Sequence, residues 1–315
     1  MKIKIFQPEA IYEIGKRQNQ EDAIYPPMGN ATENDMVYVL CDGMGGHERG
    51  EIASNMVCKA VSSYICKNSS KDTIITDDII HDAIEAAQSQ LDELGAGGLR
   101  KPGTTIAILC LHKGGVIVAH IGDSRIYHIR PIEHRILYKS RDHSLVYDLF
   151  MAGEITFDEI ETFNRKNVIT RALMPQMESI PKVDIVHITD VCSGDYFYLC
   201  SDGMLEHMKD QELVDLLCQE IEEKEKMERL VEETKENRDN HTAYLLRIAE
   251  VESENKDEKL LNDESQVRCN AILLENEAHC KKKEIIPSEA SLSIIGKIRK
   301  FIKKCLKKHI SDVRP

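Results

Sequence analysis

The sequence lacks any apolar run long enough to span a bilayer, which needs about 20 residues. It also lacks the CxxC and Cys/His spacings of zinc sites, although it contains 10 Cys. No P-loop or base-binding motif is evident, and a net charge of −13 counts against a general nucleic-acid binder. These absences exclude a membrane span and a zinc site, and we do not expect nucleic acid as a partner.

The cysteines and the first residues indicate a compartment. Cys41, Cys110 and Cys200 lie inside apolar strand-like runs, where cysteine packs as a small hydrophobic residue. The stretch from Met1 to Phe6 lacks the apolar core of a signal peptide. We therefore expect a cytoplasmic protein in a reducing environment.

Residues 1–250 alternate strands, turns and helices without an internal repeat. Strand-like runs cover Met36–Cys41, Thr104–His112, Val116–Ile121, Tyr196–Cys200 and Ala243–Ile248. Helix-like stretches cover Glu51–Cys66, Thr76–Leu94, Ser144–Met151 and Gln211–Glu222. Lys113, Gly114 and Gly115 join two of these strands as a hairpin. This order predicts a strand-rich α+β domain rather than a parallel βαβ sheet.

Aspartates recur at the ends of the predicted strands. Apolar runs lead into Asp42-Gly43, Gly122-Asp123 and Asp202-Gly203, while Glu21-Asp22 and Asp239-Asn240 precede other strands. Strands of a packed sheet share their ends, so these carboxylates can converge on one edge of the domain. Several carboxylates close together need a countercharge, and Mg²⁺ or Mn²⁺ prefers oxygen ligands of this kind.

Each of these pairs also has a simpler interpretation. A single Asp-Gly pair is more often a turn than a ligand, and Glu21-Asp22 alone fits a solvated surface pair. The three residues Asp123 to Arg125 alone fit a surface ion pair of little energetic weight. Only the recurrence of the pattern favours a metal centre.

Taken together, the motifs resemble those of the metal-dependent type-2C serine/threonine protein phosphatases, in their bacterial form. The motifs, in order, are Arg17-x-x-x-Glu21-Asp22, Asp42-Gly43-Met44-Gly45-Gly46-His47, Gly103-Thr104-Thr105, Gly122-Asp123-Ser124-Arg125, Ser201-Asp202-Gly203 and Asp239-Asn240-His241-Thr242. The resemblance implies a four-layer α-β-β-α sandwich, with two antiparallel sheets flanked by helix pairs. It also implies a centre of two Mn²⁺ or Mg²⁺ ions at one end, with a weaker third ion in bacterial members.

The resemblance assigns a role to each matching position. Asp42 would bridge the two metals, and the Gly43 carbonyl would bind one of them. Asp202 and Asp239 match ligands of the other metal, and Asp123 matches a position that helps to hold the third ion. Asp22 matches a further acidic position, and Glu21 one that acts through metal-bound water. Arg17 matches the arginine that grips the substrate phosphate, for which a planar guanidinium suits better than an ammonium.

The implied activity is hydrolysis of phosphoserine and phosphothreonine by a metal-activated water. The implied substrates are phosphoproteins, made by a cognate serine/threonine kinase. One alternative is a catalytically weak phosphoprotein-binding scaffold on the same fold. Another is a metal-dependent hydrolase of nucleotides or small phosphate esters. Residues 142–171 resemble the flap of bacterial members, and we interpret His120 and His128 as packed or solvated side chains.

The end of the chain lies outside the resemblance. Residues 251–290 are polar and largely acidic and predict a linker. Residues 291–315 contain the stretch SIIGKIRKFIKKCLKKHI, with apolar residues on one helical face and no acidic residue between Leu292 and Ile310. The apolar face holds Ile294, Ile295, Ile298, Phe301, Ile302, Cys305 and Leu306.

This pattern predicts a basic amphipathic helix with three interpretations. It fits an interfacial helix at the anionic inner face of a membrane, through residues 292–310. It also fits a helix docked on the acidic body of the same chain. A partner protein or nucleic acid is the third interpretation.

Overall fold

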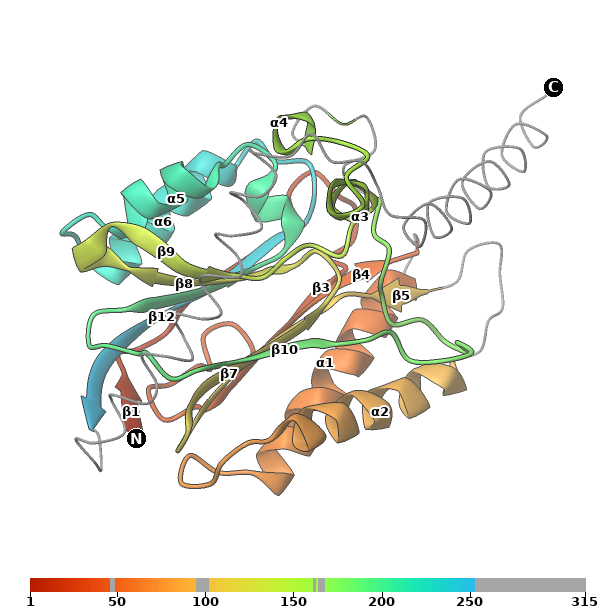
Figure 1. Ribbon diagram of the computed structural model, residues 1–315, viewed down its shortest axis with the longest axis horizontal. Coiled ribbons are helices and arrows are strands. Elements are labelled where there is room, and N and C mark those ends of the chain that lie inside the picture. The colour runs from red at the N-terminus through yellow and green to blue at the C-terminus, as the bar shows by residue number, and fades with distance from the viewer. Residues whose placement is uncertain (46–48, 95–101, 161–162, 164–167, 253–315) are drawn as a thin grey trace.

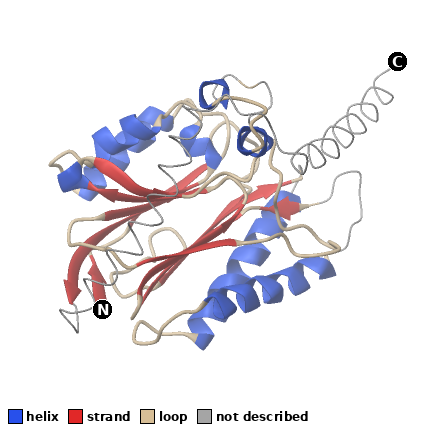
Figure 2. Ribbon diagram, in the orientation of Figure 1, coloured by secondary structure: helices blue, strands red, loops and turns tan. Residues whose placement is uncertain are grey.

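The computed structural model describes residues 1–45, 49–94, 102–160, 163 and 168–252. Within these residues the chain forms two six-stranded antiparallel sheets that face each other. Helices cover the outer side of each sheet, so that the strands lie between two helical layers (Figures 1 and 2). The predicted four-layer α-β-β-α sandwich is confirmed.

The two sheets draw strands from both halves of the chain. The first sheet has the order β1-β12-β11-β8-β9, with β2 paired to β12, and the second has the order β10-β7-β6-β4-β3, with β5 paired to β4. The first consists of β1 (Lys2–Ile5), β2 (Glu9–Glu13), β8 (Arg125–Arg130), β9 (Arg135–Lys139), β11 (Tyr196–Cys200) and β12 (His241–Glu252). The second consists of β3 (Asp22–Tyr25), β4 (Val37–Met44), β5 (Gly103–Thr104), β6 (Ile106–His112), β7 (Gly115–Ile121) and β10 (Asp184–Ile188).

Strand β4 shows why apolar runs form the centre of this fold. Val37, Val39 and Cys41 point to the helical layer, and Tyr38 and Leu40 point to the other sheet. All five are buried, because both faces of the strand are covered. The continuous apolar run in the sequence therefore reflects a strand between two hydrophobic cores.

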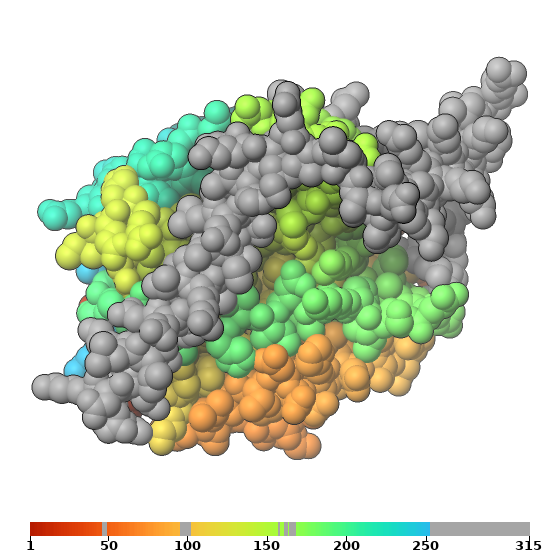
Figure 3. Space-filling view, viewed as in Figure 1, coloured from red at the N-terminus to blue at the C-terminus, as the bar shows by residue number. Residues whose placement is uncertain are grey.

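The helices pack in pairs. Helices α1 (Arg49–Asn68) and α2 (Asp77–Glu93) cover the second sheet, while α5 (Asp210–Leu217) and α6 (Glu223–Thr234) cover the first. Helices α3 (Leu145–Met151) and α4 (Phe157–Ile160) lie in the segment between β9 and β10. The surface of β10, in green, borders that of α2, in orange, in Figure 3, and His187 Nε2 lies 2.6 Å from Asp77 Oδ1 across this border.

Several predicted elements differ from the structure in extent. The predicted strand Met36–Cys41 continues to Met44, and the predicted strand Thr104–His112 is divided into β5 and β6. The predicted helix Gln211–Glu222 is wrong in extent, because α5 ends at Leu217 and α6 begins at Glu223. The buried ammonium of Lys226 donates to the Leu217 carbonyl at 2.8 Å and so satisfies the end of α5. The predicted strand Ala243–Ile248 extends to Glu252, because its polar last residues pair with β1.

The predicted linker and basic helix lie outside the described residues, except for Val251 and Glu252, which end β12. Among the helices of the described ranges, none is both long and apolar enough to cross a bilayer.

Candidate metal centre

Both sheets bring aspartates to one end of the sandwich. Asp22 and Asp42 face each other directly across the β3–β4 ladder of the second sheet. In the first sheet, Cys200 of β11 pairs with Ala243 of β12, so Asp202 and Asp239 lie at neighbouring strand ends. The Ser201 hydroxyl donates to Asp22 Oδ2 at 2.8 Å and joins the two sheets at this end.

The carboxyl groups of this end influence one another. Burial raises the pKa of Asp42 well above its ordinary value, and the negative charges of Asp22, Asp202, Asp123 and Asp239 raise it further. We call Asp22, Asp42, Asp123, Asp202 and Asp239 the carboxylate cluster.

The cluster has the chemistry of a cation site. Burial and the charges of Asp202 and Asp239 raise the pKa of Asp22 to about 7. Burial and the charge of Asp239 raise the pKa of Asp202 to about 6. Asp22 Oδ1 and Asp123 Oδ1 are buried, and within the described residues neither has a hydrogen-bond partner. Buried oxygens without partners and mutually repelling carboxylates both fit divalent cations, which supply the missing partner and the countercharge.

The main chain around Asp42 is held by the Gly103-Thr104-Thr105 motif. The Asp42 carbonyl accepts from Thr104 Oγ1 and from the Thr105 amide, both at 2.9 Å. The Asp42 amide donates to Thr105 Oγ1 at 3.0 Å. The sequence alone does not indicate a function for this motif, because its hydrogen bonds to Asp42 connect residues about 60 positions apart.

Gly43 lies where a side chain has no room. Its amide donates to the Glu21 carbonyl at 3.0 Å. A Cβ atom at this position would lie 2.3 Å from the Gly50 carbonyl oxygen and 2.5 Å from the Glu21 carbonyl oxygen. Glycine here allows three segments of main chain to meet beside Asp42.

Arg17 lies at the rim of the carboxylate cluster. Its side chain is half exposed, and its Nη2 lies 2.5 Å from Asp239 Oδ2. Its Nη1 lies 4.0 Å from Glu21 Oε2, a looser contact. The structure thus brings Arg17 and Glu21 next to the cluster, as the sequence motifs predict.

Two functional positions were not predicted from the sequence. The Asn240 side chain accepts from the Glu21 amide at 2.7 Å and donates to the carbonyls of Ile14 and Asn19 at 2.9 and 3.0 Å. It therefore holds the loop that carries Arg17. The Glu206 carboxylate accepts from the Asp239 amide at 3.0 Å. In the sequence, the position of Asn240 directly after an aspartate only weakly indicates that it belongs to the site. Nothing in the sequence around Glu206 indicates this.

The fold is that of a metal-dependent protein phosphatase, and the comparisons with known proteins agree. A family model described as Protein phosphatase 2C matches residues 12–247. Protein phosphatase PhpP of Streptococcus pneumoniae is 34% identical over 219 residues, which are 69% of this chain and 85% of PhpP. The chain therefore belongs to the protein phosphatase 2C family, and the predicted resemblance is confirmed.

Solved structures show the same fold. The serine/threonine phosphatase PstP of Mycobacterium tuberculosis aligns with a TM-score of 0.66 at 26% identity, over 78% of this chain and 100% of PstP. The Streptococcus agalactiae serine/threonine phosphatase aligns with a TM-score of 0.63 at 29% identity, over 77% of this chain and 99% of its own. A PstP catalytic domain in complex with two manganese ions aligns with a TM-score of 0.61 at 27% identity, over 78% of this chain and 100% of that domain.

Without cations, we expect the free energy of unfolding to fall as the pH rises from about 4 to about 8. The folded-state pKa values of Asp22 and Asp202 are raised, to about 7 and about 6. A raised folded-state pKa favours the protonated form, so its stabilisation is complete below the unfolded value and is lost as the pH rises through the folded one. Added Mn²⁺ should therefore raise the melting temperature more at about pH 8 than at about pH 5.

Thermal unfolding in EDTA and in Mn²⁺ across this range measures the effect, and Asp22→Asn, which removes one of the titrating groups, should flatten the EDTA curve. A melting temperature in EDTA that climbs over the same range would contradict the expected sign.

Proposed function

We propose that this protein hydrolyses phosphoserine and phosphothreonine in other proteins, with water as the nucleophile and two Mn²⁺ or Mg²⁺ ions as cofactors. The observation that supports this most strongly is the carboxylate cluster, which gathers buried acidic groups from both sheets of a chain of this family. The finding of two manganese ions in a related PstP domain supports the ion count.

The proposal gives each acidic position a function. Asp42 would be shared by the two cations, the Gly43 carbonyl would hold one of them, and Asp202 and Asp239 would hold the other. Asp22 would hold a cation directly or through water, Glu21 would act through metal-bound water, and Asp123 would help to hold a weaker third ion. When bound, the cations supply a water that loses its proton near neutral pH and positive charge for the phosphoryl oxygens.

The protein's own groups orient this chemistry. Thr104 and Thr105 fix the main chain at Asp42, and Asn240 fixes the loop that carries Arg17. The Arg17 guanidinium, half exposed at the rim, is placed to bind a phosphate that enters the site. No serine or cysteine nucleophile is needed, because water attacks the phosphorus directly.

A panel of substrates with one preparation tests the proposed substrate class. We expect release of phosphate from phosphoserine and phosphothreonine peptides in Mn²⁺, and little from ATP or phosphotyrosine peptides. Turnover of nucleotides in preference to the peptides would favour the small-ester alternative. Binding of phosphopeptides without any turnover in Mn²⁺ or Mg²⁺ would favour the scaffold.

Arg17→Ala is expected to raise KM for a phosphothreonine peptide by about 10- to 100-fold, since a charge-assisted hydrogen bond contributes about 1.5–3 kcal/mol. Its affinity for Mn²⁺ should stay within a few-fold of the parent, because arginine is not a metal ligand. Steady-state kinetics and calorimetric Mn²⁺ titration separate the two effects. Lys16→Ala is the matched control, because Lys16 forms an exposed ion pair with Glu236 at 2.7 Å. Weakened Mn²⁺ binding with an unchanged KM would assign Arg17 to the metals instead.

The partners proposed beyond the substrate are a cognate kinase, which supplies the phosphoproteins, and an anionic membrane surface for residues 292–310. The basic residues of this stretch favour such a surface by about 1 kcal/mol each. The acidic linker would then separate the phosphatase domain from the membrane.

We expect the full chain to co-sediment with phosphatidylserine vesicles at low salt and a chain ending at Glu252 to stay in solution. Replacing Lys303, Lys304, Lys307 and Lys308 with Glu, at full length, should abolish co-sedimentation. Equal sedimentation of the three proteins would contradict the tether and favour docking on the protein's own acidic surface.

A further inference from the structure

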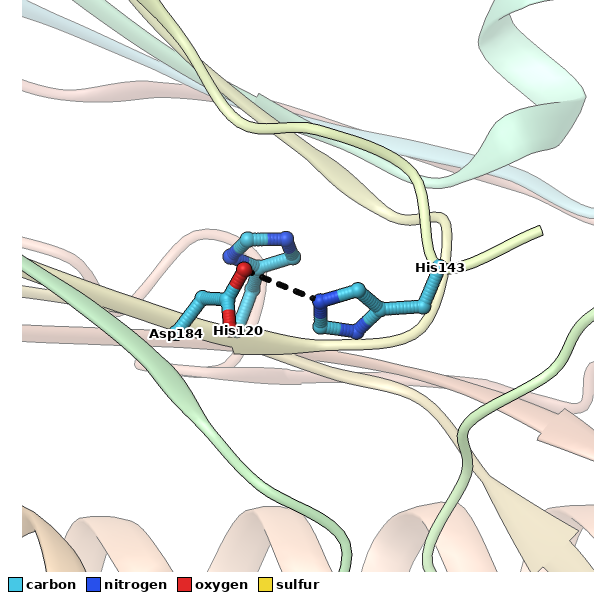
Figure 4. A group of neighbouring side chains, drawn as sticks. All are labelled: His120, His143 and Asp184. Atoms are coloured by element: carbon cyan, nitrogen blue, oxygen red, sulfur yellow. Dashed lines mark ion pairs between the residues drawn. The ribbon is translucent and has the colours of Figure 1, made fainter. Parts of the chain in front are cut away.

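A second group of titratable side chains lies beside the carboxylate cluster. His120 of β7, His143 and Asp184 of β10 offer ligand atoms that all lie within 4.8 Å of one another. Figure 4 shows the two imidazole rings and the carboxylate directed toward one another. The rings are stacked, with centroids 4.6 Å apart and planes 13° apart.

Hydrogen bonds argue against a cation at this group. His143 Nδ1 accepts from the Gly122 amide at 3.0 Å, so a neutral ring carries its proton on Nε2. That nitrogen lies 3.2 Å from Asp184 Oδ2, to which it donates, and so has no lone pair for a metal. Arg171 Nη1 lies 3.1 Å from the same nitrogen and 3.3 Å from Asp184 Oδ1, and its guanidinium already supplies positive charge here.

The ring of His143 stays neutral at ordinary pH, which keeps this arrangement of protons. Burial, together with the neighbouring His120, lowers the pKa of His143 to about 4. His120 Nε2 lies 2.8 Å from the Arg141 carbonyl, to which it donates. The two histidines thus hold residues 141–143 against the end of β7.

His143 also connects three segments through its main chain. Its amide donates to the Gly122 carbonyl at 2.9 Å, and its carbonyl accepts from the Thr170 amide at 2.8 Å. Gly122 is therefore bonded twice to one residue, once by the backbone and once by the ring. The next residue along the chain is Asp123, a member of the carboxylate cluster, whose buried Oδ1 has no hydrogen-bond partner among the described residues.

The residue before His143 anchors the other side of Asp123. Asp142 accepts two hydrogen bonds from Arg125, each at 2.7 Å. Asp123 therefore lies between two anchored positions, Gly122 on one side and Arg125 on the other. Gly122 is bonded to His143 and Arg125 is bonded to Asp142, and these two partners are adjacent in the sequence.

We propose that His143 is a positioning residue for Asp123, which fixes the turn at Gly122 through its ring and is itself oriented by Asp184, the carboxylate that Arg171 pairs with. The inference rests on the proposed function only in taking Asp123 as a cation ligand. The fold has a matched group elsewhere, in which His128 Nε2 lies 2.9 Å from Asp195 Oδ2 and Arg130 Nε donates to Asp195 Oδ1 at 2.9 Å. This group lies at the end of β11 opposite to Asp202 and serves as a control.

Two substitutions of His143 test the hydrogen bonds of its two ring nitrogens separately. In His143→Asn the amide oxygen can replace Nδ1 as the acceptor for Gly122, whereas in His143→Gln the longer side chain replaces Nε2 and leaves the Gly122 amide without its side-chain acceptor. We expect His143→Gln to speed hydrogen exchange of the Gly122 amide at least ten-fold and to weaken the lowest-affinity Mn²⁺ binding step about ten-fold. His143→Asn should stay within about three-fold of the parent in both measurements.

Exchange is followed by NMR in EDTA, and Mn²⁺ binding by calorimetric titration of the full chain. His128→Asn should lower the melting temperature and leave both readouts unchanged. Parent-like exchange and binding in His143→Gln would overturn the proposal, and so would an equal loss of Mn²⁺ binding in His128→Asn.

If His143→Gln does not fold, Asp184→Asn, which leaves the ring in place, should still weaken the same Mn²⁺ step, and parent-like binding would overturn the proposal. If the parent protein binds no Mn²⁺, the proposed function is contradicted instead. Hydrogen exchange of the Gly122 amide would still test its hydrogen bond to the His143 ring.

Discussion

Asp42→Asn is expected to abolish phosphatase turnover while leaving the protein folded. The carboxylate is the proposed bridge between the two cations, and loss of one electrostatic group of an active site already costs about 10²- to 10³-fold in kcat. Loss of a ligand that both cations share should lower kcat by more than this. Without cations, the same substitution should raise the melting temperature, because it removes a buried charge that four neighbouring aspartates repel.

Phosphopeptide assays in excess Mn²⁺ and thermal unfolding in EDTA measure the two effects. Asp195→Asn is the matched control, because Asp195 is also a buried aspartate but pairs with His128 and Arg130 away from the cluster. It should lower the melting temperature and keep turnover near that of the parent. An Asp42→Asn protein with turnover near the parent's would contradict the proposed bridge.

Gly43→Ala should have the second-largest effect, this time on both folding and activity. The new Cβ would lie 2.3 Å from the Gly50 carbonyl oxygen and 2.5 Å from that of Glu21, and both belong to the main chain. Overpacking of this kind costs about 1–3 kcal/mol, and it would move the Glu21 loop away from Asp42. We expect a lower melting temperature and at least a ten-fold loss of turnover at saturating Mn²⁺.

Gly29→Ala provides the comparison, since Gly29 has a left-handed φ of +78° but nothing within 4 Å of the added Cβ. It should cost about 1–2 kcal/mol of stability through backbone strain and leave turnover unchanged. Normal turnover in Gly43→Ala would show that the close approach at Gly43 does not matter for the site.

The acidic end of the molecule could be predicted from the sequence for a local reason, whereas the four layers followed only from the family resemblance. Strand β4 begins as a short apolar run and continues into Asp42-Gly43, and such a pattern is visible within ten residues of sequence. That Asp22 and Asp42 lie opposite each other depends on strand pairing. Their position at strand ends predicts one shared edge, but neither this pattern nor the resemblance to known phosphatases gives the register that sets them opposite each other.

Contacts between distant segments could not be predicted in this way. Thr105 holds Asp42 across 63 positions, and Asn240 holds Glu21 across 219 positions. Their side chains are ordinary polar residues whose partners exist only in the folded chain. His120 was interpreted as a packed or solvated side chain, and it is buried, but its stacking on His143 has no sequence signal.

The break between α5 and α6 shows the same limit within one segment. Residues 211–222 contain neither glycine nor proline, so nothing local marks the end of α5 at Leu217. The end is fixed by the buried Lys226, whose ammonium bonds the Leu217 carbonyl and the Tyr196 hydroxyl. Tertiary packing decided the boundary, as it commonly does for helix ends.

The most direct test of the central claim is a single assay of phosphothreonine-peptide hydrolysis by one preparation, in excess EDTA and again after excess Mn²⁺ is restored. The carboxylate cluster predicts no measurable turnover in EDTA and full recovery on addition of Mn²⁺, with no recovery in the Asp42→Asn protein. Full turnover in excess EDTA would contradict the claim that hydrolysis depends on cations held by these aspartates.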